Sequence, residues 1–132
     1  MDIIGPNNAT YSIKGSFDCT STNIIYAITC KLCPTAVYIG QTGQSLRQRM
    51  NSHKFDIRNK NTEKPVAEHF NLPGHSVSQL TVAVLQQRAF KDRIQREAAE
   101  QKITNKLDCI NGGLNRDHGF LSHYSSDSSP FV

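Results

Sequence analysis

The sequence predicts an α/β (α+β) domain with a small three-stranded antiparallel sheet flanked by helices. Three observations lead to this fold class. The chain has 132 residues, a length that fits a single domain with one core. It contains three short stretches rich in β-branched and aromatic residues, and longer stretches in which apolar residues recur at helical spacing. Along the chain these stretches follow the order β-β-α-α-β-α, which is typical of a sheet with helices packed against it.

The first two strands are expected at residues 23–29 and 36–40, on either side of the turn-like sequence Cys-Lys-Leu-Cys-Pro. Both stretches are rich in isoleucine, valine and tyrosine. Strands that are so close along the chain are expected to pair as an antiparallel hairpin. The third strand is expected at residues 80–85, which read Leu-Thr-Val-Ala-Val-Leu.

Three helices are expected, from residue 44 to about residue 60, from 65 to 70, and from about 90 to 107. In the first helix the remaining residues are mostly basic or amide, so it should be amphipathic with a basic face. Its apolar positions are Leu46, Met50 and Ile57. The second helix should stop at a Leu-Pro-Gly sequence, and the third at a pair of glycines.

The ends of the chain differ in character from its centre. Residues 1–18 are expected to form an N-terminal extension, residues 19–118 the folded domain, and the serine-rich residues 119–132 a disordered tail. No stretch approaches the roughly 18 apolar residues that span a bilayer, and the first residues do not resemble a secretory signal. We therefore expect an intracellular protein without a membrane partner.

The formal net charge of +4 favours polyanions such as nucleic acids as partners, because lysine and arginine displace counterions from phosphates. The four cysteines, Cys19, Cys30, Cys33 and Cys109, are an even number and so allow two disulfides. Because no secretory signal is present and Cys30 is separated from Cys33 by only two residues, a reduced metal-binding pair is favoured.

Two tyrosines are expected at the same end of the sheet. Folding the hairpin about its turn brings Tyr26 of the first strand near Tyr38 of the second. Arg49 follows eleven residues after Tyr38, and His53 comes four residues later, on the same helical face. Two strand tyrosines alone are also typical of a half-buried packing face. Their combination with Arg49 and His53 indicates a site.

Residues 24–26 (Ile-Ile-Tyr), 38–40 (Tyr-Ile-Gly) and 46–53 (Leu-x-x-Arg-x-x-x-His) resemble, in this order, motifs of the GIY-YIG nuclease superfamily. Members of this superfamily cut DNA with these tyrosines, this arginine and a later glutamate that holds a divalent metal. The resemblance therefore implies a DNA substrate, a catalytic Mg²⁺ or Mn²⁺ ion and no organic cofactor. It implies catalytic roles for Tyr26, Tyr38, Arg49 and His53.

The resemblance places the metal-binding carboxylate at Glu100, three residues before a large apolar residue, and a further catalytic residue at Asn115 after the helix. On a helix Glu100 lies within about 20° of Leu107, at the border of the apolar stripe. The nearest competitor, Glu97, lies about 60° further from this stripe. We therefore expect Glu100 to reach the cleft.

Three positions depart from the motifs of the superfamily. Ile24 replaces a glycine, which a strand tolerates, and Ile103 stands where relatives often have tryptophan. Gln41 stands where some relatives have a lysine that could help to deprotonate a tyrosine or water. The sequence therefore does not decide which tyrosine acts as the general base.

A closer resemblance is to the endonuclease domains of Penelope-like retroelements, which carry Cys-x-x-Cys between the tyrosine motifs and a later His-Phe segment that ends in Gly-His. It covers roughly residues 19–116 and implies a structural zinc ion. It also implies either an excised domain of a longer parent protein with a reverse transcriptase domain or a stand-alone descendant of such a protein. Independently, Cys-x₂-Cys and His-x₅-His supply the four ligands of a tetrahedral zinc site. Unrelated histidines beside a reduced cysteine pair, and Cys19 as a replacement ligand, are alternatives. The expected zinc ligands are Cys30, Cys33, His69 and His75.

Two other functions fit part of the sequence. A non-catalytic, zinc-containing nucleic-acid-binding module would not need the tyrosines, the arginine and the glutamate together. A thiol redox domain is disfavoured because Cys30 and Cys33 are expected in a hairpin turn and not at a helix N-terminus, which would stabilise a thiolate. The sequence therefore predicts a metal-dependent DNA endonuclease with a nicking or cleaving activity of retroelement type, located in the nucleus.

Overall fold

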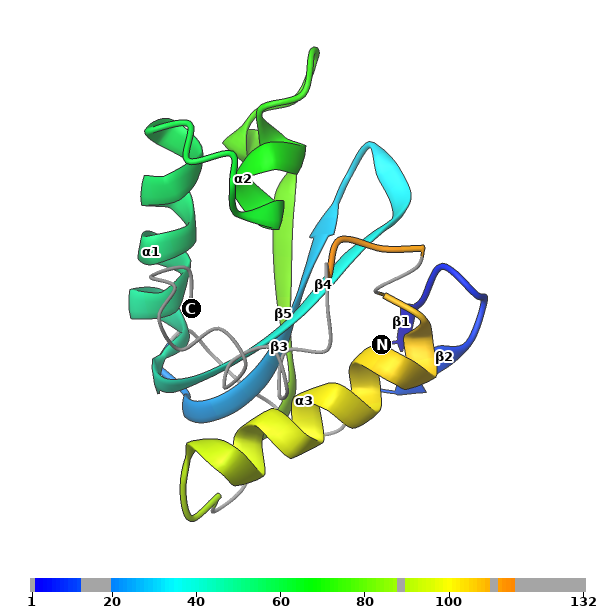
Figure 1. Cartoon of the computed structure of the whole chain (residues 1–132), viewed down its shortest axis with the longest axis vertical. Coiled ribbons are helices and arrows are strands. Elements are labelled where there is room, and N and C mark those ends of the chain that lie inside the picture. The colour runs from blue at the N-terminus through cyan, green and yellow to red at the C-terminus, as the bar shows by residue number, and fades with distance from the viewer. Residues whose placement is uncertain (1, 13–19, 88–89, 110–111, 116–132) are drawn as a thin grey trace.

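The computed structural model describes residues 2–12, 20–87, 90–109 and 112–115. Its main sheet has three antiparallel strands in the order β4-β3-β5, so the predicted three-stranded antiparallel sheet is confirmed. A separate two-stranded hairpin precedes it (Figure 1). The elements are β1 (Asp2–Ile4), β2 (Thr10–Ser12), β3 (Thr22–Cys30), β4 (Cys33–Ser45), α1 (Leu46–Arg58), α2 (Pro65–Phe70), the short 3₁₀ helix η1 (Val77–Gln79), β5 (Leu80–Gln87) and α3 (Arg93–Leu107). Among these residues, no helix combines the length and the apolar character that crossing a bilayer requires.

Strand β3 is the centre of the molecule. Its residues from Ile24 to Ile28 are fully buried, because the sheet is covered on both faces. This explains why the sequence of β3 shows a continuous apolar run and not an alternation. One face packs against α1 and α2, and the other packs against α3 (Figure 1).

Strand β4 is longer than the sequence indicated. It pairs with β3 from Cys33 to Ser45, with an irregularity near each end of the ladder. Its second half reads Gln-Thr-Gly-Gln-Ser, which is not a strand pattern. Pairing with the apolar start of β3 holds these polar residues in the sheet, so tertiary context overrides local propensity.

Helix α1 begins directly after β4, at a capping box. The side chain of Ser45 accepts a hydrogen bond from the backbone of Gln48, and the Gln48 side chain accepts one from the backbone of Ser45. The predicted apolar positions of α1 are all buried. Its C-terminus is joined to α2 by Asn71, whose amide donates to the backbone oxygen of Ile57.

Helix α3 begins at Arg93 and not at residue 90, because the side chain of Asp92 caps it by accepting from the backbone of Gln95. It ends at Asp108, which adopts a left-handed backbone conformation. The buried side chains of Ala99, Ile103 and Leu107 hold the helix against the sheet.

The N-terminal hairpin packs against the C-terminal end of α3, a contact that the sequence did not reveal. Gly5 lies so close to Leu107 that a Cβ atom on Gly5 would be 2.5 Å from its backbone oxygen. The amide of Asn7 donates to the backbone oxygen of Lys106 at 3.0 Å, which satisfies one of the open carbonyls at the helix end. Each strand of the hairpin has only three residues, too few for a recognisable pattern. The expected tail, residues 119–132, lies outside the described residues.

We expect Gly5→Ala to lower the free energy of unfolding by about 1–3 kcal/mol, because the added methyl group forces the hairpin away from Leu107. Urea unfolding monitored by circular dichroism measures this change. Thr10→Ala is the control on the same hairpin, because Thr10 is exposed. Equal stabilities of the two variants would contradict the docking of the hairpin on α3.

Candidate active site

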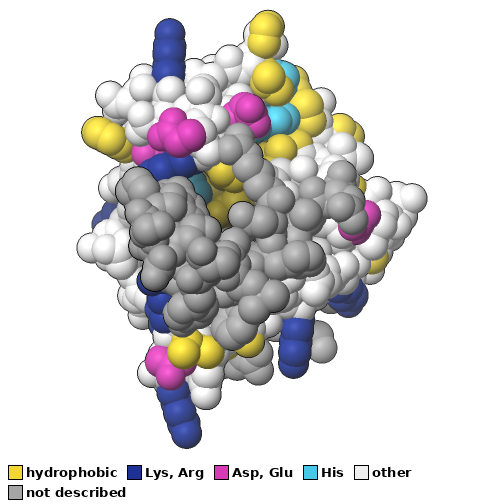
Figure 2. Space-filling model, in the orientation of Figure 1, with side chains coloured by type: hydrophobic (Ala, Val, Ile, Leu, Met, Phe, Trp, Pro, Cys, Tyr) yellow, Lys and Arg dark blue, Asp and Glu magenta, His cyan; other side chains and the backbone are white. Residues whose placement is uncertain are grey.

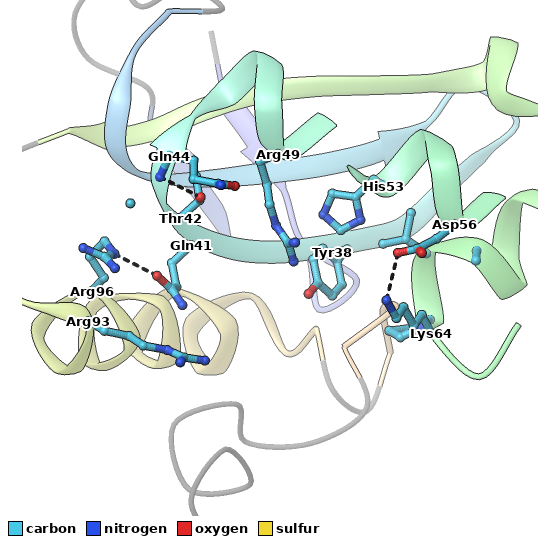
Figure 3. A pocket seen from close by; sticks show the side chains of 14 residues that line it. Tyr38, Gln41, Thr42, Gln44, Arg49, His53, Asp56, Lys64, Arg93 and Arg96 are labelled. Atoms are coloured by element: carbon cyan, nitrogen blue, oxygen red, sulfur yellow. Dashed lines mark hydrogen bonds and ion pairs between the residues drawn. The ribbon is translucent and has the colours of Figure 1, made fainter. Parts of the chain in front are cut away.

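A cleft of about 520 Å³ runs along the edge strand β4. Helices α1 and α2 form one wall, and the first turn of α3 forms the other (Figure 3). The side chains that line it are mostly polar or charged. They include Tyr38, Gln41, Thr42, Gln44, Arg49, His53, Asp56, Lys64, Arg93 and Arg96.

Tyr26 joins the sheet to α1 from beneath the cleft. Its side chain is fully buried, and its hydroxyl lies 3.0 Å from Nε of Arg49 and 2.7 Å from Nε2 of His53. Arginine can only donate hydrogen bonds, so the Tyr26 oxygen accepts from Arg49. Its proton is then donated to His53, which requires a neutral imidazole with an unprotonated Nε2. The structure thus brings three of the predicted site residues together.

His53 is suited to this accepting role. Burial of its ring and the positive charge of Arg49 lower the pKa of His53 to about 3, so the ring is neutral at physiological pH. Its edge contacts both tyrosine rings, with ring centroids 5.8 Å from Tyr26 and 5.7 Å from Tyr38. His53 therefore fixes the relative position of the two phenols.

Gly40 is required by the position of Tyr26. The two residues are partners across β3 and β4, and the Tyr26 ring lies across the backbone of Gly40. A Cβ atom at residue 40 would overlap the end of the Tyr26 ring and its hydroxyl. This close approach explains why the Tyr-Ile-Gly sequence of β4 ends in glycine.

Tyr38 differs from Tyr26 because it lines the cleft. Burial raises the pKa of both phenols above the usual value. The negative charges of nearby groups add to this increase, whereas Arg49 opposes it. Both phenols are therefore protonated at neutral pH, and either would need additional positive charge to act as a base.

Asp56 completes the polar face of α1, seven residues after Arg49. Although burial raises the pKa of its carboxyl group, hydrogen bonds from Asn61 (3.0 Å) and Lys64 (3.1 Å) hold that pKa below its usual value. Sequence analysis missed Asp56, although its spacing from Arg49 and His53 places it on the same helical face. The carboxylate is neutralised by Lys64 at the α2 end of the cleft.

Glu100 lies near enough to the two tyrosines to act on them electrostatically, but it is not among the residues that line the cleft, where the sequence led us to expect it. Its negative charge contributes to the raised pKa values of Tyr26 and Tyr38, although α3 packs on the other face of the sheet. This proximity is consistent with the choice of Glu100 as a metal ligand. A Mg²⁺ ion fits a site with a single carboxylate, because it usually retains several waters and binds one or two carboxylates.

Glu97 is buried although its position on the helix is further from the apolar stripe than that of Glu100. Glu97 is 3% exposed and forms an ion pair with Arg93 at 2.7 Å. The buried stripe of α3 is wider than its apolar residues indicate, because it also contains Thr104. Thr104 is seven residues after Glu97 and donates its hydroxyl to the backbone oxygen of Glu100.

Asn115 holds the end of the described chain against β4. Its side-chain oxygen accepts from the backbone N–H of Ile39, and its amide donates to the backbone oxygen of Ile39, both at 2.9 Å. It is not among the residues that line the cleft. The structure thus supports a positioning role for Asn115, next to Tyr38 and Gly40.

Cys30, Cys33, His69 and His75 form a second cluster and can hold a metal ion. One ligand atom from each residue lies within 4.8 Å of all the others, and the two cysteines are not in a disulfide. Nε2 of His69 is buried without a hydrogen-bond partner, an arrangement that a bound metal would satisfy. Figure 2 shows histidine side chains beside hydrophobic ones on the upper part of the molecule. Cys19, the alternative ligand, lies outside the described residues.

We expect the free energy of unfolding to fall as the pH decreases, and we expect His53 to contribute to this loss. The pKa of His53 is about 3 in the folded state, whereas the ordinary pKa of histidine is 6.5, so the unfolded chain binds a proton first as the pH decreases. The stabilisation is present above pH 6.5 and is lost towards pH 3, by up to about 1.4 kcal/mol per pH unit. Urea unfolding of the wild type and of His53→Gln between pH 7 and 4.5 measures the difference. The same pH dependence in both proteins would show that His53 is not buried in its neutral form.

Comparison with known proteins agrees with this geometry. Residues 22–108 match the family model of the GIY-YIG catalytic domain. No curated protein and no solved structure matches the chain. The matched residues make up more than half of the chain and contain the paired strands, Tyr26, Tyr38, Arg49 and Glu100. The chain therefore belongs to the GIY-YIG family, whose members are endonucleases that act on nucleic acid.

Proposed function

We propose that this protein is a metal-dependent DNA endonuclease that hydrolyses phosphodiester bonds in the β4 cleft. The observation that carries the proposal is the hydrogen-bonded group of Tyr26, Arg49 and His53 beneath the cleft, with Glu100 close to both tyrosines. A purely nucleic-acid-binding module has no need for a buried phenol that fixes an arginine and a neutral histidine.

Arg49 is the proposed ligand of the scissile phosphate. It lines the cleft, and the neighbouring phenols raise its pKa, so it keeps its positive charge. The Tyr26 hydroxyl holds Nε of Arg49, which fixes the direction of the guanidinium group. Hydrogen bonds from this group to a non-bridging oxygen would stabilise the charge that develops in the transition state.

We assign the role of general base to Tyr38. Tyr38 lines the cleft, whereas Tyr26 is fully buried and uses its hydroxyl for Arg49 and His53. In this proposal Tyr38 first loses its own proton to solvent, and its phenolate oxygen then takes a proton from the attacking water while the water oxygen bonds to phosphorus and the bond to the leaving 3′ oxygen breaks. A divalent cation at Glu100 would supply the positive charge that lowers the pKa of the phenol and neutralises the leaving group.

The second metal site is proposed to be structural zinc, bound by Cys30, Cys33, His69 and His75. Two thiolates and two imidazoles are the usual ligands of a closed zinc site, which has no open position for water. The cysteines lie at the end of the β3–β4 hairpin, and the histidines lie on α2 and the following loop. The zinc ion would hold α2 against the hairpin that carries both tyrosines.

The retroelement origin is a further proposal, supported by this Cys-His arrangement. The parent protein would then include a reverse transcriptase domain and would nick or cleave chromosomal DNA in the nucleus. A non-catalytic zinc-containing binding module is the alternative. Cleavage of DNA by the purified chain distinguishes the two.

We expect the wild type to nick or cleave supercoiled plasmid with added Mg²⁺ or Mn²⁺, and Glu100→Gln to reduce the rate by about 100-fold or more. Gel electrophoresis measures the rate, and circular dichroism confirms that the variant is folded. Glu63→Gln is the matched control, because Glu63 is exposed and, unlike Glu100, is not among the charges that raise the pKa values of Tyr26 and Tyr38. Glu97 is not a suitable control because it is buried and paired with Arg93. Cleavage at the wild-type rate by folded Glu100→Gln would refute the assignment of the metal ligand.

We expect protein purified without chelator to contain one equivalent of zinc, as measured by elemental analysis. Cys33→Ser and His75→Ala should lower the zinc content and the melting temperature together, because metal binding contributes to folding. Cys109→Ala is the control and should retain zinc, because Cys109 belongs to the core cluster on the α3 face. Folded, active protein without zinc would refute the site. Retention of zinc by Cys30→Ser with its loss in Cys19→Ser would identify Cys19 as a ligand.

A further inference from the structure

The α3 end of the cleft carries two arginines that the proposed chemistry does not use. Arg93 and Arg96 both line the cleft, on the wall opposite Arg49 (Figure 3). Both lie in the first turn of α3, which contains no acidic residue. Cations are unfavourable there, because the N-terminus is the positive end of the helix dipole. Two arginines that line the cleft at this end of the helix favour a bound anion.

The two arginines are held in different ways. Arg96 is engaged by the sheet: its Nε donates to Gln41 at 2.8 Å, and one terminal nitrogen donates to Asn23 at 2.9 Å. It thus links α3 to β4 and to the start of β3. Arg93 is anchored from its own helix.

The anchor of Arg93 is the buried carboxylate of Glu97. The Arg93 side chain is 50% exposed, the Glu97 side chain is 4% exposed, and Nε of Arg93 lies 2.7 Å from a carboxylate oxygen. Because Glu97 is buried, its carboxylate holds the guanidinium group of Arg93 in one direction. Arg93 is therefore a preoriented cation at the cleft, and preorientation lowers the entropic cost of binding an anion.

The opposite end of the cleft lacks this excess charge. There, Lys64 is paired with Asp56 at 3.1 Å, and the two charges cancel. At the α3 end, Arg93 and Arg96 are among the described side chains that line the cleft, whereas the carboxylates of Asp92 and Glu97 are not. A DNA strand that places one phosphate at Arg49 has a neighbouring phosphate on each side, and the charge distribution favours the side of α3.

We propose that Arg93 forms a second phosphate subsite, which binds the phosphate adjacent to the scissile one on the cleaved strand. This inference rests on the proposed function, since it takes the strand position from Arg49. Arg93 thus sets the direction in which the strand lies along β4, and Glu97 is its positioning residue.

The test measures binding of a fluorescent DNA duplex by fluorescence anisotropy at several salt concentrations, without added divalent metal. Arg93→Gln should weaken binding about 10-fold and reduce the slope of log affinity against log salt by roughly 0.9, the contribution of one phosphate contact in duplex DNA. Lys102→Gln removes the same charge from an exposed position of α3 outside the cleft and should change the affinity less than 2-fold. Equal losses in these two variants would overturn the subsite.

A double variant separates the subsite from general electrostatics and from misfolding. Arg93→Gln with Glu97→Gln keeps the wild-type net charge and leaves no unpaired buried carboxylate. It should bind DNA as weakly as Arg93→Gln, and wild-type affinity of this folded double variant would refute the proposal.

Neutral methylphosphonate groups, placed one at a time in the DNA backbone, identify the phosphate that Arg93 binds. A methylphosphonate at the phosphate next to the cut should weaken binding of the wild type and should have no further effect on binding of Arg93→Gln. If instead the substitution at every position weakened binding of Arg93→Gln as much as it weakens binding of the wild type, the contact would be refuted. The binding measurements do not depend on cleavage. An inactive wild type with Arg93-dependent binding would therefore overturn the proposed nuclease activity and leave the subsite in place.

Discussion

The hydroxyl group of Tyr26 is the contact on which the site depends. It is buried between the sheet and α1, where a polar group without hydrogen bonds would destabilise the fold by about 1–3 kcal/mol. Arg49 and His53 satisfy it, and their positions on α1 are fixed in return. The same requirement explains the glycine at residue 40, because any side chain there would displace the Tyr26 ring. The interactions that stabilise the interface between β3, β4 and α1 are therefore also those that orient the arginine of the cleft.

Much of this arrangement was predictable from residue types and spacing. The β-branched and aromatic residues of β3 and β5 predicted strands, and the spacing of Arg49 and His53 placed them on one helical face, where the structure has them. The Cys-x₂-Cys and His-x₅-His pairs predicted one cluster, and their ligand atoms do converge. In each of these cases the information lies in the residue types of one segment or in the spacing within a short motif.

The features that sequence analysis missed depend on long-range packing. The polar half of β4 forms a strand only because β3 lies beside it. Glu97 lies away from the apolar stripe of α3, but it is buried because α3 packs on the sheet along a wider face than its apolar residues define. Arg93 and Arg96 become part of the cleft only when α3 packs next to β4. The three-residue strands of the N-terminal hairpin have no periodicity to detect, and their contacts with α3 involve backbone atoms.

The pairing of Asn115 with Ile39 has a consequence for how copies of the protein behave towards one another. Strand β4 is an edge strand, and exposed backbone groups at such an edge invite strand addition by another chain. The side chain of Asn115 occupies both backbone groups of Ile39, and the backbone N–H of Leu114 occupies the oxygen of Val37. This stretch of the edge is therefore closed to intermolecular sheet formation, which protects a concentrated solution of the protein against aggregation through β4.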